Sequence, residues 1–440
     1  MLDKFKNTID EKFPFLKNGK IYLAISGGKD SMTLSHLLLA ENMEHTLLHC
    51  NFNLRGKESD ADEAFLVQYA AQHKLKIETV QFNTAQIAAE KKLSIQECAR
   101  NLRYDWFNLF LQKEENSFLL TAHHLDDSIE TFFINLFRGT GYRGLAGIPP
   151  MNGKIIRPLS EFTADEIYRY IDLNKIEYRT DSSNAKKDYL RNKIRLDLIP
   201  ELLELQPDMR SKMSTLFEEL NDLKKYMNTE RDKFNQQFLD SKSDYFRYPI
   251  TALKECDPFL REHVLNTYGI HRKNAAEFEK FLHAQTGSEF FTSNNKFIID
   301  RDLISILPNK KLASDLSYLI EKLPFRQEIN TSVLSLYESK DTRIDKTNQA
   351  IQKLDLAQIK LPVQLRHWKN GDRMKPLGMR GTKLISDILT DNKISSAERS
   401  MQLVLEDHTG EIISIPGMVI SEDFKITEDS TMALIIELTI

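Results

Sequence analysis

The most constraining feature of this chain is a short apolar segment that runs directly into a glycine turn. Residues 21–25 read Ile-Tyr-Leu-Ala-Ile, and residues 26–31 follow as Ser-Gly-Gly-Lys-Asp-Ser. Five apolar or aromatic residues in a row predict a buried parallel strand. Two glycines allow the backbone to turn sharply, and Ser31 is expected to be the N-cap of the helix that follows.

A strand, a tight turn and the start of a helix together predict an anion site, because unpaired N–H groups and the positive helix end converge there. The serine hydroxyls add donors, and Asp30 is placed to hold Mg²⁺. The pattern lacks the longer loop of the Walker motif. It resembles the pyrophosphate loop (PP loop) of the ATP pyrophosphatases, which implies ATP binding by Ser26, Gly27, Gly28, Lys29, Asp30 and Ser31. The alternative is a glycine turn that binds nothing.

Length and composition limit the classes of protein to which the chain can belong. The 440 residues exceed one hydrophobic core, so two or three domains are expected. A net charge of −4 argues against indiscriminate nucleic-acid binding but allows a local basic surface. No apolar run reaches membrane-spanning length, and no secretory signal is apparent. Three widely spaced cysteines are typical of a reducing compartment, so we expect a cytoplasmic protein without a membrane partner.

Strand and helix signals alternate from residue 21 to about residue 158, which predicts an α/β fold. Repeated βαβ units imply a doubly wound parallel sheet of the PP-loop ATPase type. A mainly helical region follows, residues 307–361 are interpreted as a polar connector, and short strands near the end predict a small α/β domain. The expected domains are a catalytic ATP-binding domain at 1–205, a mainly helical domain at 206–340 and a small α/β domain at 360–440.

Polar clusters follow three of the predicted strands at the same edge of the sheet. Residues 26–31 follow the first strand, residues 49–51 end the second, and residues 123–127 (His-His-Leu-Asp-Asp) follow the fourth. Ligands of such sheets bind beyond the carboxyl ends of the strands. Three clusters that are far apart in sequence are therefore expected to meet at one site.

The segment 123–127, with Glu130 one turn later, is dense in groups that bind cations. Capping of a helix start is a sufficient explanation for Asp126. A zinc or phosphohydrolase site is a further alternative. Beside an ATP loop, Asp127 and Glu130 on one helix face could instead bind a cation or steer an amine.

Arginines and glycines elsewhere suggest contact with phosphate or RNA. Residues 138–147 form a glycine-rich loop that either is a surface turn or approaches a nucleotide closely. Arg103 lies beside the apolar stripe of a predicted helix, where a solvated position is the usual alternative. A tighter basic cluster, which could also be a solvated face, comprises Lys186, Lys187, Arg191, Lys193 and Arg195.

Residues 366–383 form the most informative basic run of the chain. This run holds six Lys or Arg residues against one Asp, together with Trp368 and loop glycines. Such a composition suits contact with a phosphate backbone, although a plain basic loop is an alternative.

Together these motifs resemble the tRNA(Ile)-lysidine synthetase family. They occur in family order along most of the chain, and only residues 210–350 contain none. Phe52 stands where many members have His, so no role is assigned to it. The resemblance is carried by residues 26–31, 49–56, 97–104, 121–127, 138–147 and 191–195, and then by Trp368, 371–373, 376–378 and 383–387.

The resemblance implies an ATP-dependent ligase that acts on the wobble cytidine of tRNA(Ile) with a CAU anticodon. Such an enzyme adenylates the C2 oxygen of cytidine and attaches free L-lysine through its ε-amine, which gives lysidine and releases AMP and pyrophosphate. ATP is then a co-substrate, and Mg²⁺ held by Asp30 is the expected cofactor. The domains at 206–340 and 360–440 would contact the tRNA. Whether the chain forms a homodimer is left open by the sequence.

The resemblance also implies roles for single residues. His123, Asp127 and Glu130 would handle lysine and the transition state, while Arg103 and Arg195 would serve the phosphate or tRNA side. The expected catalytic residues are Asp30, Arg103, His123, Asp127 and Glu130. Expected to bind lysine or tRNA are Asp127, Glu130, Arg191, Arg195, Trp368, Arg373 and Arg380.

Two alternatives remain at this stage. A tRNA thiolase of the same ATP class would need cysteines near the site, and only Cys50 abuts the sheet edge. A non-catalytic, ATP-sensing RNA-binding protein would release no pyrophosphate.

Overall fold

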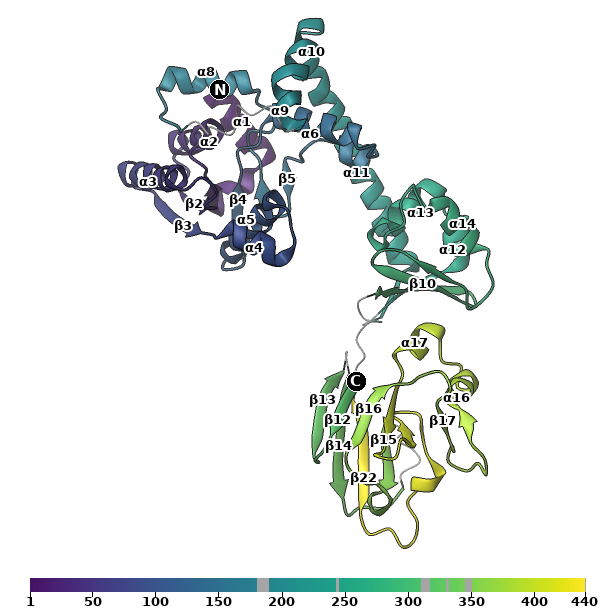
Figure 1. Cartoon of the computed structure of the whole chain (residues 1–440). Coiled ribbons are helices and arrows are strands. Elements are labelled where there is room, and N and C mark those ends of the chain that lie inside the picture. The colour runs from purple at the N-terminus through teal and green to yellow at the C-terminus, as the bar shows by residue number, and fades with distance from the viewer. Residues whose placement is uncertain (180–189, 243–244, 310–316, 330–331, 345–349, 440) are drawn as a thin grey trace. The chain divides into compact units, whose positions relative to one another are not determined.

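The computed structural model describes residues 1–439 except 180–189, 243–244, 310–316, 330–331 and 345–349. It divides the chain into two compact units, Met1–Tyr226 and Met227–Ile440, whose elements are labelled in Figure 1. Lys186 and Lys187 of the predicted basic cluster lie outside the described residues. Within the described ranges, no helix has both the length and the apolar character needed to cross a membrane.

A six-stranded sheet forms the centre of the first unit. Its order is β3-β2-β1-β4-β6-β5, and all neighbours are parallel except the short β5–β6 hairpin. The predicted parallel α/β sheet is therefore confirmed. Its strands are β1 (Lys20–Ala24), β2 (His45–Asn51), β3 (Lys76–Gln81), β4 (Ser117–Leu120), β5 (Met151–Asn152) and β6 (Ile155–Ile156).

Helices cover both faces of this sheet (Figure 1). On one face, a large core buries Ile21 and Leu23 of β1; on the other, Tyr22 packs against Phe107 and Leu111 of α5. Because β1 is buried on both faces, its sequence is apolar throughout. The covering helices are α1 (Leu2–Lys12), α2 (Lys29–Ala40), α3 (Lys57–Gln72), α4 (Thr84–Lys91), α5 (Ile95–Leu111) and α8 (Ala164–Asn174).

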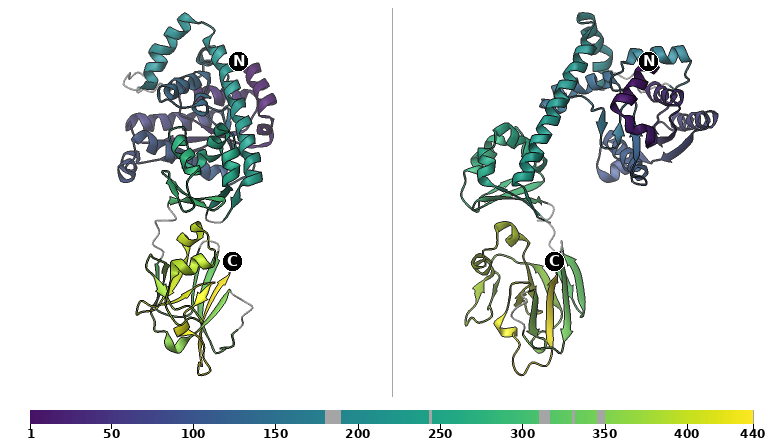
Figure 2. Two further views of the ribbon diagram at one scale, coloured as in Figure 1. Left: turned by 90° about the vertical axis from the view of Figure 1, so that its right-hand side faces the viewer. Right: turned by 180° about the vertical axis from the view of Figure 1, so that it is seen from behind.

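The remaining helices of the first unit pack around Ile129, Ile199 and Phe217. The longest, α11 (Met209–Phe238), begins the region predicted to be mainly helical and is seen from two sides in Figure 2. The division between the units falls within α11, beyond the predicted domain end at residue 205. The other helices are α6 (Leu125–Phe137), α7 (Tyr142–Leu145), α9 (Leu190–Lys193) and α10 (Ile199–Leu205).

The second unit begins with an antiparallel sheet that carries three helices over a core containing Tyr248, Phe278 and Phe297. The helical character predicted for this region is present, but the sheet, in the order β7-β8-β11-β10-β9, was not predicted. Its elements are β7 (Asp240–Ser241), β8 (Phe246–Pro249), α12 (Ile250–Glu255), α13 (Pro258–Leu265), α14 (Ala275–Leu282), β9 (Glu289–Phe291), β10 (Asn295–Asp300) and β11 (Leu303–Pro308).

Two antiparallel sheets enclose one core in the C-terminal part, with Leu336, Leu405 and Leu434 at its centre. Their orders are β12-β16-β19-β20-β21 and β13-β14-β22-β15, and a β17–β18 ribbon lies beside them. The elements are β12 (Ser317–Ile320), β13 (Phe325–Ile329), β14 (Ser332–Ser339), β15 (Ile351–Asp355), β16 (Val363–His367), β17 (Arg373–Met374), β18 (Lys383–Leu384), α16 (Ile385–Asp391), α17 (Ser396–Met401), β19 (Leu403–Glu406), β20 (Ile412–Ile415), β21 (Val419–Ile420) and β22 (Ala433–Thr439).

The predicted connector at residues 307–361 is wrong. Strand β12 pairs with β16, and β14 pairs with β22, so this region supplies strands to both C-terminal sheets. Residues 360–440 are therefore only part of the C-terminal fold. The region lacked a clear pattern because β12 and β13 are edge strands with many exposed side chains.

Candidate active site

Residues 26–31 form a tight turn between β1 and α2. Gly27 has a φ of +81°, a conformation that favours glycine, whereas Gly28 is extended and is the helix N-cap. The N-cap role predicted for Ser31 is wrong, because Ser31 lies inside the first turn of α2. Its hydroxyl donates to the carbonyl of Gly28 at 3.0 Å and accepts from the N–H of Ser26 at 3.2 Å. The turn is thus fixed by its own polar groups at a helix N-terminus, where anions bind.

A cavity of about 740 Å³ opens at the carboxyl ends of β1, β2 and β4. The loop after β1, the end of β2 and the segment after β4 all line it, so the three polar clusters do meet. Helix α5 adds Arg103 and Tyr104 to the wall. Of the residues predicted for the site, those lining the cavity are Ser26, Gly28, Asp30, Ser31, Arg103, His123, Asp127 and Arg191.

Lys29, Glu130 and Arg195 do not line this cavity. The ammonium nitrogen of Lys29 lies 4.2 Å from the ring centroid of Tyr168 and 5.1 Å from that of Tyr178. The charge therefore rests on two aromatic faces, and the role of Lys29 in ATP binding stays a prediction.

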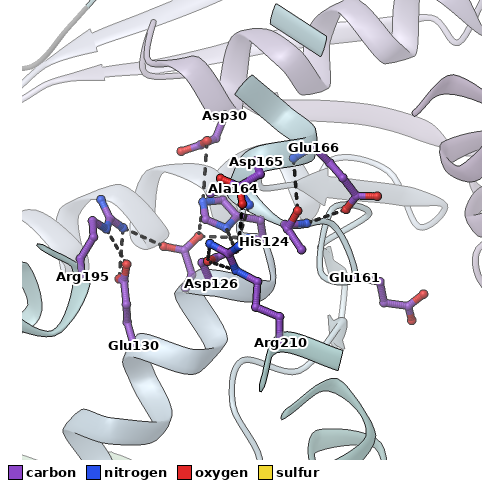
Figure 3. A network of polar contacts seen from close by, with 12 residues as sticks. Asp30, His124, Asp126, Glu130, Glu161, Ala164, Asp165, Glu166, Arg195 and Arg210 are labelled. Carbon is purple, nitrogen blue, oxygen red and sulfur yellow. Dashed lines mark hydrogen bonds and ion pairs between the residues drawn. The ribbon is translucent and has the colours of Figure 1, made fainter. Parts of the chain in front are cut away.

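The carboxylates of Asp127 and Glu130 are bound by two arginines. Arg191 donates to Glu130 at 2.6 Å and to Asp127 at 2.9 Å. Arg195, in a π-helical turn at Ile194–Leu198, also binds Glu130 (Figure 3) and lies 3.4 Å from Asp127. Burial alone would raise the pKa of Asp127, but His124 and Arg191 hold it below its ordinary value. Glu130 itself is fully buried, so removal of either arginine would leave a buried carboxylate with fewer partners, which is costly.

The imidazole of His123 lies in the cavity wall, with Nδ1 3.0 Å from the hydroxyl of Thr121. Burial lowers the pKa of His123 to about 4. The ring is therefore neutral near pH 7 and brings no charge into the cavity.

The carboxylate of Asp30 projects into the cavity from the first turn of α2. Its Oδ1 is buried and accepts no hydrogen bond from the described residues, and burial raises its pKa. The described part of the chain contains no group of three or more His, Cys, Asp or Glu that could hold a metal ion. The buried Oδ1 of Asp30, which has no hydrogen-bond donor among the described residues, fits a Mg²⁺ ion, which would take this one carboxylate from the protein and its other ligands from phosphates and water.

Comparison with known proteins assigns the chain to a family. Residues 1–202 match the model of a PP-loop domain, and residues 363–436 match that of the TilS substrate C-terminal domain. The chain is 34% identical over 403 residues to the tRNA(Ile)-lysidine synthase of Bacteroides thetaiotaomicron, with 90% of each chain covered. This chain belongs to the tRNA(Ile)-lysidine synthase family. It is also 30% identical to the Bacillus subtilis member, covering 95% of this chain and 94% of that one.

Membership of the tRNA(Ile)-lysidine synthase family makes the chain an ATP-dependent ligase that modifies tRNA by forming lysidine. Among solved structures, a TILS C-terminal domain aligns with 28% of this chain and 97% of that chain, at 23% identity and a TM-score of 0.26. The U34-tRNA thiolase NcsA of Methanococcus maripaludis aligns with 50% of this chain and 77% of its own, at 20% identity and a TM-score of 0.43.

The residues predicted to bind RNA in the second unit differ in exposure. Arg373 and Arg380 are exposed, as a phosphate contact requires. Trp368 is partly buried against the core around Met374, and its indole N–H donates to the carbonyl of Arg399. Packing is sufficient to explain Trp368, and its role in binding stays a prediction.

Sequence reasoning missed two buried residues of this lysidine synthase family member, His124 and Asp126. His124 is 4% exposed and faces Asp30, whereas its neighbour His123 had been chosen from the sequence. Asp126 had been explained as a cap, but it accepts from the N–H of Ala164 and from Arg210. The sequence signal for His124 was that two histidines stand in a row at the end of a strand. The sequence does not show which of the two rings faces Asp30, because the path of the backbone decides this.

Proposed function

We propose that the chain joins L-lysine to the wobble cytidine of tRNA(Ile) with a CAU anticodon in two steps at one cavity. In the first step, the C2 oxygen of cytidine attacks the α-phosphate of ATP, the bond to the β-phosphate breaks, and pyrophosphate leaves. In the second step, the ε-amine of lysine attacks C2 and loses a proton. The bond from C2 to the adenylated oxygen breaks, and AMP leaves.

The observation that carries this proposal is that the PP loop and Asp127 line the same cavity. The loop N–H groups and the start of α2 would receive the phosphates. Asp127 would receive the positively charged amine before it attacks. The target cytidine lies in a single-stranded loop of the tRNA, so it can enter without melting a duplex.

The arginine partners of the acids set a condition on lysine entry. Asp127 already accepts from Arg191, so an incoming ammonium must replace that guanidinium or share the carboxylate with it. The neutral ring of His123 is placed to accept the proton that the amine loses. Asp30 would hold Mg²⁺, which supplies charge neutralisation at the phosphates when it is bound.

The direct experiment is an incubation of the chain with ATP, radiolabelled L-lysine and total bacterial tRNA. We expect label in a single modified nucleoside after digestion, in an amount equal to the pyrophosphate released. The Asp30→Asn variant serves as the control and should give both products about 10²–10³-fold more slowly. A tRNA transcript whose wobble base is uridine should stay unlabelled, because it has no cytidine at the wobble position.

Two outcomes would overturn the proposal. ATP-dependent incorporation of sulfur in place of lysine would identify a thiolase. Binding of ATP and tRNA without release of pyrophosphate would identify a non-catalytic sensor.

A further inference from the structure

A buried imidazole stands between three carboxylates at the start of α6. The Nε2 of His124 lies 3.7 Å from Oδ1 of Asp30 and 3.5 Å from Oδ2 of Asp127, and its Nδ1 lies 3.9 Å from Oδ2 of Asp126. Figure 3 shows the ring between Asp30 on one side and Asp126 on the other. Only 4% of His124 is exposed, so water cannot easily take the place of a protein partner.

Two of these three carboxylates are already held in place. Asp126 accepts from the N–H of Ala164 and from Arg210, both at 2.8 Å. Asp127 accepts from the backbone N–H of His124 at 3.0 Å and from Arg191. These contacts come from α8, α11 and α9, so they fix both acids relative to three helices.

The carboxylate of Asp30 is the one that is not fixed. Its Oδ1 is buried and accepts no hydrogen bond from the described residues. Within those residues no lysine or arginine forms an ion pair with Asp30, because Lys29 lies over Tyr168 and Arg195 binds Glu130. Among the described side chains, the one that forms an ion-pair contact with this oxygen is His124, through Nε2.

We propose that His124 is a positioning residue for the first reaction step, donating from Nε2 to Oδ1 of Asp30 when the cavity is filled. The present 3.7 Å separation must shorten by about 0.5–1 Å to reach hydrogen-bond range, and such contacts tighten when a substrate binds. The bond would orient the other oxygen of Asp30 toward the phosphates and their metal ion. Asp127, whose Oδ2 also lies 3.5 Å from Nε2, would then stand at a fixed distance from Asp30.

The role of His124 in the first reaction step rests on the proposed function, but the measurement of Mn²⁺ binding does not depend on that function. His124→Leu should lower the maximal rate of pyrophosphate release by about 10–100-fold, the usual cost of removing a group that orients a metal ligand. It should weaken by a similar factor the binding of Mn²⁺, used as a spectroscopic probe with a non-hydrolysable ATP analogue. His124→Gln keeps a donor near the position of Nε2, and it should recover most of both losses. Affinity for tRNA should not change in either variant.

A matched control separates positioning from packing. His45 is also buried, but it lies at the opposite end of β2 and contacts Ser35 and the carbonyl of Met43. His45→Gln should lower thermal stability without changing the maximal rate or the affinity for Mn²⁺.

The inference is overturned if His124→Leu binds Mn²⁺ as the unchanged chain does, or if the leucine and glutamine variants are equally impaired. Failure of the proposed function would appear separately, as absence of lysidine with the unchanged chain, and the Mn²⁺ measurement would still decide the role of His124.

Discussion

Two charged regions of this chain differ in how far their charged side chains are exposed to solvent. The acidic cluster of the first unit (Asp126, Asp127, Glu130 and their partners Arg191, Arg195 and Arg210) has buried carboxylates, which arginines with part of their surface exposed compensate. The basic segment of the second unit (residues 366–383) turns Arg366 inward to Asp372 and Glu406 but exposes Arg373 and Arg380. The first region keeps its carboxylates away from water, and the second presents part of its positive charge to solvent.

This difference indicates what each region can contribute. A buried charge that loses its partner is costly, so each member of the acidic cluster should have a large and specific effect. Exposed arginines contribute in small, similar and salt-dependent increments. We therefore expect chemistry to depend on single residues of the first unit, and RNA affinity to depend on the summed charge of the second.

The largest effect is expected for Asp30→Asn, which should lower pyrophosphate release by about 10²–10³-fold, as loss of one group that stabilises transition-state charge does. Because burial raises the pKa of Asp30, activity of the unchanged chain should fall on acidification at a higher pH than for an exposed aspartate. The residual activity of the variant should lack this dependence. Binding of tRNA, measured by filter retention, should persist. Its loss would contradict the expectation that chemistry depends on the first unit and RNA affinity on the second.

Glu130→Gln should give the next largest effect, because it leaves two guanidiniums facing a neutral amide. The loss in free energy of unfolding should stay below the about 3–5 kcal/mol of a fully buried pair, since Arg191 and Arg195 are 44% and 42% exposed. The KM for lysine should also rise.

Asp165→Asn is the matched control for this variant, because Asp165 pairs with Arg210 at the surface and is 58% exposed. Denaturant unfolding of both variants checks the expectation. Equal losses in the free energy of unfolding would show that the burial of Glu130 does not determine the cost of its substitution.

Local patterns predicted much of the first unit. The PP loop and the alternation of strands and helices both depend on neighbouring residues. The partners of Glu130 could not be predicted this way, because Arg191 and Arg195 lie more than sixty residues further along the chain. Their pairing depends on how α6 and α9 pack.

The second unit was harder to predict for a related reason. Its strands β12 and β13 pair with partners far along the sequence and leave much of their surface exposed, so neither shows a clean apolar pattern. Removal of residues 360–440 would take strands away from both C-terminal sheets. Charge substitutions are therefore the better test of RNA binding in this unit.

A smaller effect is expected for the double variant Arg373→Ala and Arg380→Ala. Affinity for tRNA should fall several-fold at low salt, and the slope of log affinity against log salt should shrink by about two. The control is Lys375→Ala with Lys383→Ala, because these lysines pair with Asp423 and Asp391 and should change the slope less. Equal slopes for the two double variants would remove the distinction between exposed and paired cations.

The smallest effect is expected for Cys50→Ser, although Cys50 lines the cavity. Burial raises the pKa of Cys50 to about 12, so the thiol is neutral near pH 7 and is a poor nucleophile, since the thiolate is the reactive form. Serine has nearly the same shape, and the rate of pyrophosphate release should therefore stay within about twofold, as expected for a substitution that disturbs neither packing nor chemistry. Abolition of turnover with unchanged tRNA affinity would instead require a reactive sulfur in the first unit, and it would favour the thiolase over the ligase.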